Sequence, residues 1–176
     1  LDYLISRHSG KPYAQFMRED VFEPLAMSNT FVGLPAERVD DAAVKYDRQG
    51  KAVEQYGFDH DGASAVYSSA HDLAMFALFN LGRISKGQTA ILDEDALQRL
   101  HTPTNPISAG LGYGMGWATN ENDSGYKTVS HTGGMPGVAT RLTLVPEHGI
   151  AVVCLCNTPS SLPHKTVKKL LSVLLE

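Results

Sequence analysis

The sequence predicts an α+β fold: an antiparallel sheet of three to four strands with flanking helices. Two observations support this prediction. Apolar residues recur at helical spacing as far as Leu100, whereas from Gly110 they follow the two-residue period of strands. From His164 to Leu175 the helical spacing returns, so a last helix should pack on the sheet. No internal repeat or low-complexity segment interrupts the chain, and we assign residues 1–176 to a single domain.

The first helical region is divided at Gly10, and a second helix is expected over 12–21. Pro12 suits a first helical turn because its missing N–H would have no partner there. This helix should end in the loop at Pro24. Residues 42–56 then alternate around turn residues and predict a short hairpin.

The clearest helix begins after Ser69 and ends at Gly82. The hydroxyl of Ser69 can accept backbone N–H bonds as a cap, and Asp72 places negative charge in the first turn. A shorter helix over Glu94–Leu100 follows Asp93, a second capping residue. We interpret Ser68, Ser69 and Asp72 as capping residues, with no catalytic role.

The second half predicts strands over 112–119 and 126–132, separated by turn residues 121–125. Residues 140–145 alternate in hydropathy and are followed, after a turn, by the continuous apolar run Ile150–Cys156. Such a run is typical of a strand that is covered on both faces. In the last helix, Lys165, Lys168 and Lys169 should face solvent, and the apolar face is expected to comprise Val167, Leu170, Leu171 and Leu174.

Composition excludes several classes of partner. The chain is 43% hydrophobic and 19% charged, which is ordinary for a globular domain. Its net charge of −4, without a basic stripe, argues against nucleic acid. No apolar run approaches the roughly 18 residues of a membrane span. Cys154 and Cys156 should point to the same strand face, where a disulfide would be strained, so we expect buried, reduced thiols.

The most informative motif is Ser130-His131-Thr132-Gly133-Gly134, followed by Met135-Pro136-Gly137. A strand that ends in a hydroxyl residue and two glycines lets another molecule approach its backbone, because no Cβ blocks it. Free N–H groups there could bind a carbonyl oxygen as it gains negative charge. The motif therefore predicts one half of an acyl-transfer site.

Several runs, in this order, resemble the serine β-lactamase and penicillin-binding-protein-like family, in particular its class C β-lactamase, D-alanyl-D-alanine carboxypeptidase and esterase branch. The runs are Ser9-Gly10-Lys11-Pro12-Tyr13, Phe22-Glu23-Pro24-Leu25-Ala26-Met27-Ser28-Asn29-Thr30, Tyr67-Ser68-Ser69-Ala70-His71-Asp72-Leu73-Ala74, Tyr113-Gly114-Met115-Gly116-Trp117, His131-Thr132-Gly133-Gly134 and Val152-Val153-Cys154-Leu155-Cys156-Asn157. The resemblance extends over nearly the whole chain and implies the C-terminal portion of a β-lactamase/transpeptidase-like fold.

The resemblance implies a serine acyl-enzyme mechanism built from three motifs. The first two, Ser-x-x-Lys and Tyr-x-Asn, supply the nucleophile and its proton-transfer partners. The third, Lys-Thr-Gly or His-Thr-Gly, corresponds here to His131-Thr132-Gly133. By this resemblance His131, Thr132, Gly133 and Gly134 line the substrate site, and the Gly134 N–H is one oxyanion-hole donor. No cofactor and no metal are implied, and the family suggests a periplasmic or secreted location.

The chain departs from the family pattern in two respects. It contains no Tyr-x-Asn, and Ser-x-x-Lys occurs only as Ser124-Gly125-Tyr126-Lys127, which falls in a predicted turn and out of family order. The nucleophile is therefore expected upstream of Leu1, in a missing N-terminal half of the same domain. His131 also stands where β-lactamases carry lysine; an imidazole, only partly charged at neutral pH, would hold a substrate carboxylate less firmly. This favours esterase or peptidase chemistry over penicillin hydrolysis.

Each feature also has a purely structural interpretation. His131 could be a strand histidine bonded to backbone, and Gly133-Gly134 could form a bulge or a turn. Tyr113 and Trp117, expected on one strand face, are interpreted as packing residues. Asp59-His60-Asp61 resembles a metal cluster, but neighbouring residues point apart, and no further ligand has useful spacing.

Three functional hypotheses follow. The first is a serine hydrolase acting on small-molecule or peptide substrates with amide, lactam or ester bonds, of which this chain alone is expected to be inactive. The second is a non-catalytic binding or regulatory relative that keeps the substrate groove. The third is an unrelated α+β interaction domain, in which Thr132 and Gly134 would not line a shared open cleft.

Overall fold

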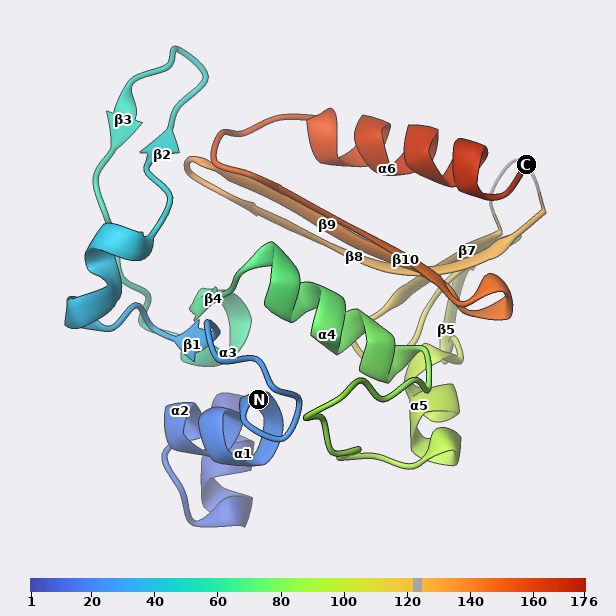
Figure 1. Cartoon of the computed structure of the whole chain (residues 1–176), viewed down its shortest axis with the longest axis horizontal. Coiled ribbons are helices and arrows are strands. Elements are labelled where there is room, and N and C mark those ends of the chain that lie inside the picture. Colours follow the sequence, from blue (N-terminus) through green and yellow to red (C-terminus); the bar gives the residue numbers. More distant parts are fainter. Residues whose placement is uncertain (122–124) are drawn as a thin grey trace.

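A computed structural model describes residues 1–121 and 125–176. It confirms the α+β class: helical segments form the first part of the chain and an antiparallel sheet the second (Figure 1). Ser124, the serine of the only Ser-x-x-Lys match, and most of the predicted turn at 121–125 lie outside the described residues.

The N-terminal region consists of α1 (Asp2–Ser9), α2 (Tyr13–Phe16) and a wider π-helical segment, η1 (Met17–Phe22). Gly10 separates α1 from α2 in a left-handed conformation, with φ of 72°. The helix predicted over 12–21 is therefore confirmed, although its second half winds as a π-helix, which the sequence pattern did not indicate. Its apolar face enters a core cluster with Leu25 and Met27.

Short elements link this region to the sheet. β1 (Phe31–Val32) pairs with β4 (Val66–Tyr67), and β2 (Lys45–Tyr46) pairs with β3 (Ala52–Val53). The predicted hairpin over 42–56 is thus confirmed, with two paired residues in each strand. The remaining elements here are η2 (Ala36–Asp41) and α3 (Asp61–Ser64).

Both predicted helix caps are present. The Ser69 Oγ accepts the Asp72 N–H at 3.1 Å and starts α4 (Ala70–Asn80). The Asp93 Oδ1 accepts the Ala96 N–H at 2.7 Å and starts α5 (Glu94–His101). These two helices begin where their sequences predict because a cap depends on residues within a single turn.

The described residues form a six-stranded antiparallel sheet, so the expectation of three to four strands was too low. Its order is β10-β9-β8-β7-β6-β5. In chain order the strands are β5 (Asn105–Ser108), β6 (Leu111–Tyr113), β7 (Ala118–Glu121), β8 (Lys127–Met135), β9 (Val138–Val145) and β10 (Ile150–Cys156). A short helical turn, η3 (Pro146–His148), joins the last two.

The single strand predicted over 112–119 was wrong, because the chain reverses within it. Gly116 adopts φ of 82°, and the Gly114 N–H bonds to the Trp117 carbonyl at 2.8 Å. This tight turn makes β6 and β7 antiparallel neighbours, with Tyr113 opposite Ala118. Tyr113 and Trp117 consequently do not share a strand face.

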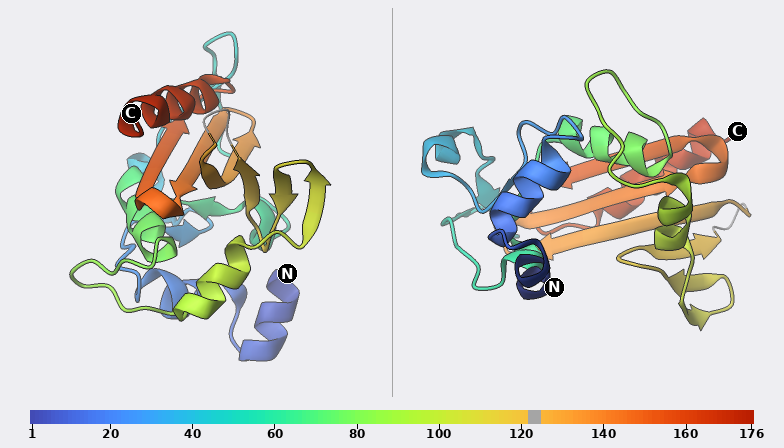
Figure 2. Two further views of the ribbon diagram at one scale, coloured as in Figure 1. Left: turned by 90° about the vertical axis from the view of Figure 1, so that its right-hand side faces the viewer. Right: turned by 90° about the horizontal axis from the view of Figure 1, so that it is seen from below.

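Helices cover both faces of the sheet, as Figure 2 shows from the side: α6 (Leu162–Leu174) on one face and α4 on the other. Both contact β10, which confirms the prediction of a strand covered on two sides. Val167 and Leu171 of α6 are buried against β10, but Leu170 and Leu174 are 44% and 54% exposed, so the predicted apolar face was too wide. The three lysines of α6 are exposed as expected.

Cys154 and Cys156 are free thiols and are only partly buried, less than predicted. Burial raises the pKa of the Cys156 thiol, and the neighbouring Cys154 raises it further. Among the described residues, no helix has the length and apolar character needed to cross a membrane.

Candidate active site

Four residues of the predicted motif, His131, Thr132, Gly133 and Gly134 (called the motif from here on), lie on the half of β8 that has a neighbour on one side only. β7 pairs with residues 127–130 of β8, and its register ends at Ala118 opposite Ser130. β9 pairs with β8 much further, from Val129 through Met135. His131, Thr132, Gly133 and Gly134 are all exposed. The motif therefore forms an open sheet edge.

The two polar residues of the motif point to opposite faces of the sheet. His131 lies opposite Leu142, which is in the core cluster that α4 covers. Thr132 lies opposite Arg141, whose guanidinium reaches His164 of α6. A molecule that contacts both side chains must therefore lie along the strand edge, between the two faces.

The backbone along this edge is oriented for binding. A two-residue turn, Pro136-Gly137, joins β8 to β9 and pairs Met135 with Val138. In a hairpin closed by a two-residue turn, the residue next to the turn directs its N–H and C=O groups toward the partner strand, and the residue before it directs them away. By this alternation, the N–H and C=O groups of Thr132 and Gly134 are directed outward, away from β9. In the described chain, neither residue forms a backbone bond beyond the sheet ladder. These N–H groups are free to meet an incoming oxyanion.

The two glycines differ in their surroundings. A Cβ on Gly133 would lie 2.4 Å from the Thr140 Oγ1, whereas a Cβ on Gly134 would meet nothing within 4 Å. Both keep regular register, opposite Thr140 and Ala139 respectively, so the bulge or turn interpretation was wrong. A side chain at Gly133 would thus crowd Thr140 within the sheet, and Gly134 leaves open space at the edge.

Tyr113 borders the motif, which the sequence did not predict. Its ring lies 6.5 Å from the His131 ring at an interplanar angle of 65°. The side chain is 36% exposed, so its aromatic face is accessible beside the edge. Trp117 instead is buried and stacks on Phe76 at 6.2 Å. Had Gly114-Met115-Gly116 been recognised as a tight turn, Tyr113 and Trp117 would have been predicted on opposite sides of that turn.

Arg141 is a second residue that sequence reasoning missed. Its guanidinium donates to the Thr143 Oγ1 at 3.0 Å and to the Ser130 Oγ at 3.3 Å, and lies 3.0 Å from the His164 Nδ1. Burial lowers the pKa of Arg141, and no carboxylate pairs with it in residues 1–121 or 125–176. A half-buried positive charge therefore sits on the strand beside Thr132. The available signal was that Arg141 is the one charged residue of β9.

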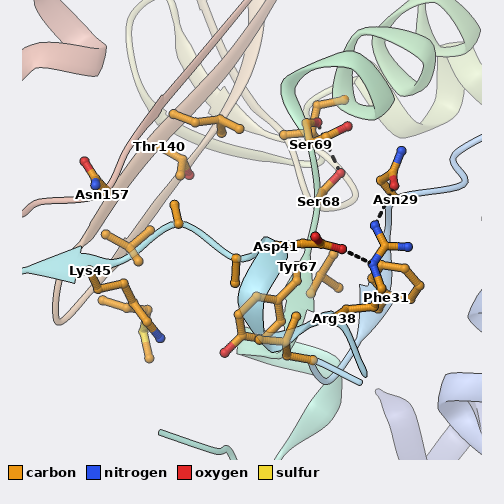
Figure 3. Close-up of a pocket in the computed structure, with 18 of the residues that line it drawn as sticks. Asn29, Phe31, Arg38, Asp41, Lys45, Tyr67, Ser68, Ser69, Thr140 and Asn157 are labelled. Carbon is orange, nitrogen blue, oxygen red and sulfur yellow. Dashed lines mark hydrogen bonds and ion pairs between the residues drawn. The ribbon is translucent and has the colours of Figure 1, made fainter. Parts of the chain in front are cut away.

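A cavity of about 650 Å³ lies near the turn end of the β8–β9 hairpin (Figure 3). Met135, Val138 and Thr140 form its wall on the sheet side, and Ser69 and Tyr67 belong to the opposite wall. The four motif residues are absent from this lining, but Thr140 lies directly opposite Gly133 in the ladder. The cavity and the open edge are therefore adjacent.

A fully buried carboxylate holds Asn29, which lines the cavity, in place. The Asp72 Oδ2 accepts the Asn29 N–H at 2.7 Å and the Thr30 hydroxyl at 2.8 Å. The Thr30 hydroxyl is also 2.8 Å from the Ser68 Oγ. Ser69 caps α4 as predicted, and Asp72 also anchors a loop that lies about forty residues earlier, a role that local sequence did not indicate.

The Asp59-His60-Asp61 sequence forms only a local pair. The Asp59 carboxylate is bonded to the His60 Nδ1, which lowers the pKa of Asp59. Both side chains are exposed, and Asp61 starts α3. Across the two described ranges, no three His, Cys, Asp or Glu side chains are grouped so that they could hold a metal ion.

A family model described as Beta-lactamase matches residues 1–174. The chain belongs to the β-lactamase family. Penicillin-binding protein 4* of Bacillus subtilis (strain 168) is 28% identical over 177 residues, covering 89% of this chain and 37% of that protein. Unguisins hydrolase ungD' of Aspergillus campestris (strain IBT 28561) is 29% identical over 172 residues, covering 90% and 32%. The chain thus spans about a third of the length of these curated relatives.

Solved structures of the β-lactamase family have the same fold. The octameric penicillin-binding protein homologue from Pyrococcus abyssi superposes with a TM-score of 0.81 at 25% identity, covering 99% of this chain and 40% of that one. A class C β-lactamase from Rhodobacter sphaeroides has a TM-score of 0.83 at 16% identity, covering 99% and 58%. The predicted family and fold are confirmed, and the unrelated interaction domain is excluded.

Proposed function

We propose that this chain is part of a serine hydrolase that acts on an amide, lactam or ester carbonyl through an acyl-enzyme. Membership of the β-lactamase family supports an enzyme of the serine-hydrolase type. The observation that carries the proposal is the open edge of β8, where the Gly134 N–H is directed outward and has space in front of it.

Each residue of the motif has a role in this mechanism. The Gly134 N–H donates to the carbonyl oxygen as it becomes an oxyanion in the tetrahedral intermediate. Gly133 lets the substrate lie against the backbone, and Thr132 contacts it from one face of the sheet. His131 contacts it from the other face, and the Tyr113 ring limits where the imidazole can move.

The nucleophile is proposed to lie upstream, in the part of the same domain that precedes Leu1. The sequence contains no Tyr-x-Asn, and its only Ser-x-x-Lys includes Ser124 in a segment between β7 and β8. The substrate is a small molecule or a peptide. The names of two relatives, a penicillin-binding protein and an unguisins hydrolase, support a hydrolase that binds such compounds.

Covalent labelling tests this proposal. The intact mass of the full-length protein and of the 176-residue chain is measured after incubation with a fluorophosphonate and, separately, with a penicillin. One fluorophosphonate adduct on the full-length protein and none on the short chain is expected; the penicillin arm reports whether lactams are substrates.

Other outcomes have defined meanings. A stoichiometric adduct on the short chain, lost in Ser124→Ala, would place the nucleophile within the chain and contradict the proposal. A full-length protein that is never labelled, yet binds a substrate-like peptide, would indicate the second hypothesis, a non-catalytic relative.

A further inference from the structure

The cavity at the end of the sheet is lined by a largely buried lysine that forms no ion pair with the described residues. Lys45 is 6% exposed and lines the cavity. Its Nζ lies 3.8 Å from the centroid of the Tyr56 ring and 5.7 Å from that of Tyr67. Burial lowers the pKa of Lys45, and no neighbouring charge or hydrogen bond opposes that effect. Two aromatic faces thus stabilise an ammonium that no carboxylate neutralises within the described residues.

Lys45 is held in place by contacts between the β2–β3 hairpin and the end of the sheet. The Tyr46 N–H donates to the Asn157 carbonyl at 2.9 Å, and the Asn157 side-chain amide donates to the Val44 carbonyl at 2.8 Å. The Tyr56 hydroxyl donates to the Pro136 carbonyl at 2.8 Å. These bonds hold the backbone on both sides of Lys45, and the Tyr56 ring beside its ammonium, against the end of the β8–β9 hairpin.

Gly137 allows this close approach. A Cβ at Gly137 would lie 2.6 Å from the Lys45 Cβ, and its φ of +73° is one that residues with side chains rarely adopt. The hairpin turn and β2 therefore fit together only because this residue is glycine.

The charges around the cavity leave one positive charge in excess. Arg38 and Asp41, which also line it, form an ion pair with each other. The nearby Asp47 carboxylate accepts the backbone N–H groups of Gln49 and Lys51. Charges attract more strongly inside a cavity than in bulk water, so a monoanion that enters this cavity gains a favourable interaction with Lys45.

We propose that this cavity is an anion subsite in which the Lys45 ammonium pairs with the carboxylate of a small ligand. One excess positive charge matches one carboxylate, and the Tyr67 hydroxyl, which makes no hydrogen bond in the part of the chain described, supplies a second donor. Phe58, Val66 and Leu155 provide an apolar wall for the rest of the ligand. The inference rests on the proposed function, because the ligand belongs to the class of substrate that is proposed to bind at the open edge of β8.

The test compares a carboxylate with its neutral amide. Isothermal titration calorimetry on the full-length protein measures the affinity for hippurate and for hippuramide, in wild type, Lys45→Met and Lys51→Met. Lys51 is an exposed lysine of the same hairpin and serves as the matched control. Hippurate affinity should fall by about ten-fold or more in Lys45→Met, since breaking a close charge pair costs at least that much. Lys51→Met should bind as wild type does.

The wild-type protein alone already gives a decisive comparison, should Lys45→Met fail to fold. Hippurate should bind about ten-fold or more tighter than hippuramide, and Lys45→Arg, which keeps the charge, should retain that preference. Equal affinity for the two probes overturns the subsite. The subsite is also overturned if hippurate does not bind and Lys45→Met has a lower Tm than wild type. These two results together would mean that the Lys45 ammonium is paired with an acidic side chain of the same protein. Fluorophosphonate labelling is independent of this result, so the two proposals fail separately.

Discussion

Residues 127–130 and 131–135 of β8 belong to one strand but have different neighbours. The first half lies between β7 and β9, and Thr128, Val129 and Ser130 are buried. The second half is paired with β9 alone, and the four residues of the motif are exposed. In the first half every outward backbone group is used by the sheet, whereas in the second the same groups are available to a ligand.

The comparison shows that the outward backbone groups of a strand stay unpaired where the neighbouring strand ends. The chain turns at Gly114–Trp117, so β7 begins only at Ala118, opposite Ser130. A β7 that began four residues earlier would pair with Thr132 and Gly134 and close the edge. The turn before β7 thus sets the length of the open segment.

The largest effect is expected from removing the outward N–H of the open half. Gly134→Pro deletes this donor without breaking a bond to β9, because the group is directed away from that strand. Loss of one oxyanion donor typically lowers the rate by about 10²–10³. We expect this decrease in the rate of fluorophosphonate labelling of the full-length protein, followed by intact mass.

Gly134→Ala is the matched control, because it keeps the N–H and its Cβ meets nothing within 4 Å. It should lose far less rate than the proline variant, with a similar Tm. If both variants lose rate equally, access to the edge matters and the hydrogen-bond donor does not.

A smaller effect, on stability, is expected at the adjacent glycine. Gly133→Ala places a methyl group 2.4 Å from the Thr140 Oγ1, and overpacking of this kind costs about 1–3 kcal/mol. Urea unfolding measures the loss, and Gly133→Ala combined with Thr140→Ala should recover most of it relative to Thr140→Ala alone. Additive losses in the double variant would show that the two residues do not clash.

The smallest expected effect is on the pH dependence of stability, through His101 in the core beside the first half of β8. His101 lies edge-on to Trp117 at 5.5 Å and is bonded to the Asn80 Oδ1 at 3.3 Å; burial lowers its pKa. The unfolded histidine, with a pKa near 6.5, then takes up a proton before the folded one does. This contribution to stability is present above about pH 6.5 and is lost as the pH falls through the lower folded value.

Urea unfolding at pH 8 and pH 5 should therefore show a smaller loss of stability on acidification in His101→Gln than in wild type. The glutamine can still bond to Asn80 but does not titrate. An equal loss in the two proteins would mean that His101 does not contribute to acid sensitivity.

Local chemistry explains what could be predicted from sequence. The helix caps at Ser69 and Asp93 could be predicted because each depends on residues within one turn of chain. The two-residue and helical periods of the apolar residues predicted most of the strands and helices. The prediction of one strand over 112–119 failed because the hydropathy pattern of a strand continues across the turn. Gly116 permits this turn by adopting a left-handed conformation. Leu170 and Leu174 were assigned to the core because spacing alone does not show how wide a face the sheet covers.

The candidate site was predicted only as far as it is continuous in sequence. His131, Thr132, Gly133 and Gly134 are neighbours in the chain and were found together. Tyr113 and Arg141 reach them from other strands, and Lys45 reaches the end of the hairpin from a separate sheet. Their approach depends on strand register, which is not encoded by neighbouring residues.

The buried Asp72 carboxylate has a consequence for the exchange of backbone hydrogens with solvent. The Asn29 amide lies in a loop, where amides ordinarily exchange quickly, but its hydrogen is bonded to a carboxylate at the start of α4. It can exchange only when the loop and the helix separate, so its protection should match that of the α4 amides. We therefore expect the loop before β1, whose Asn29 lines the cavity, to open only together with α4.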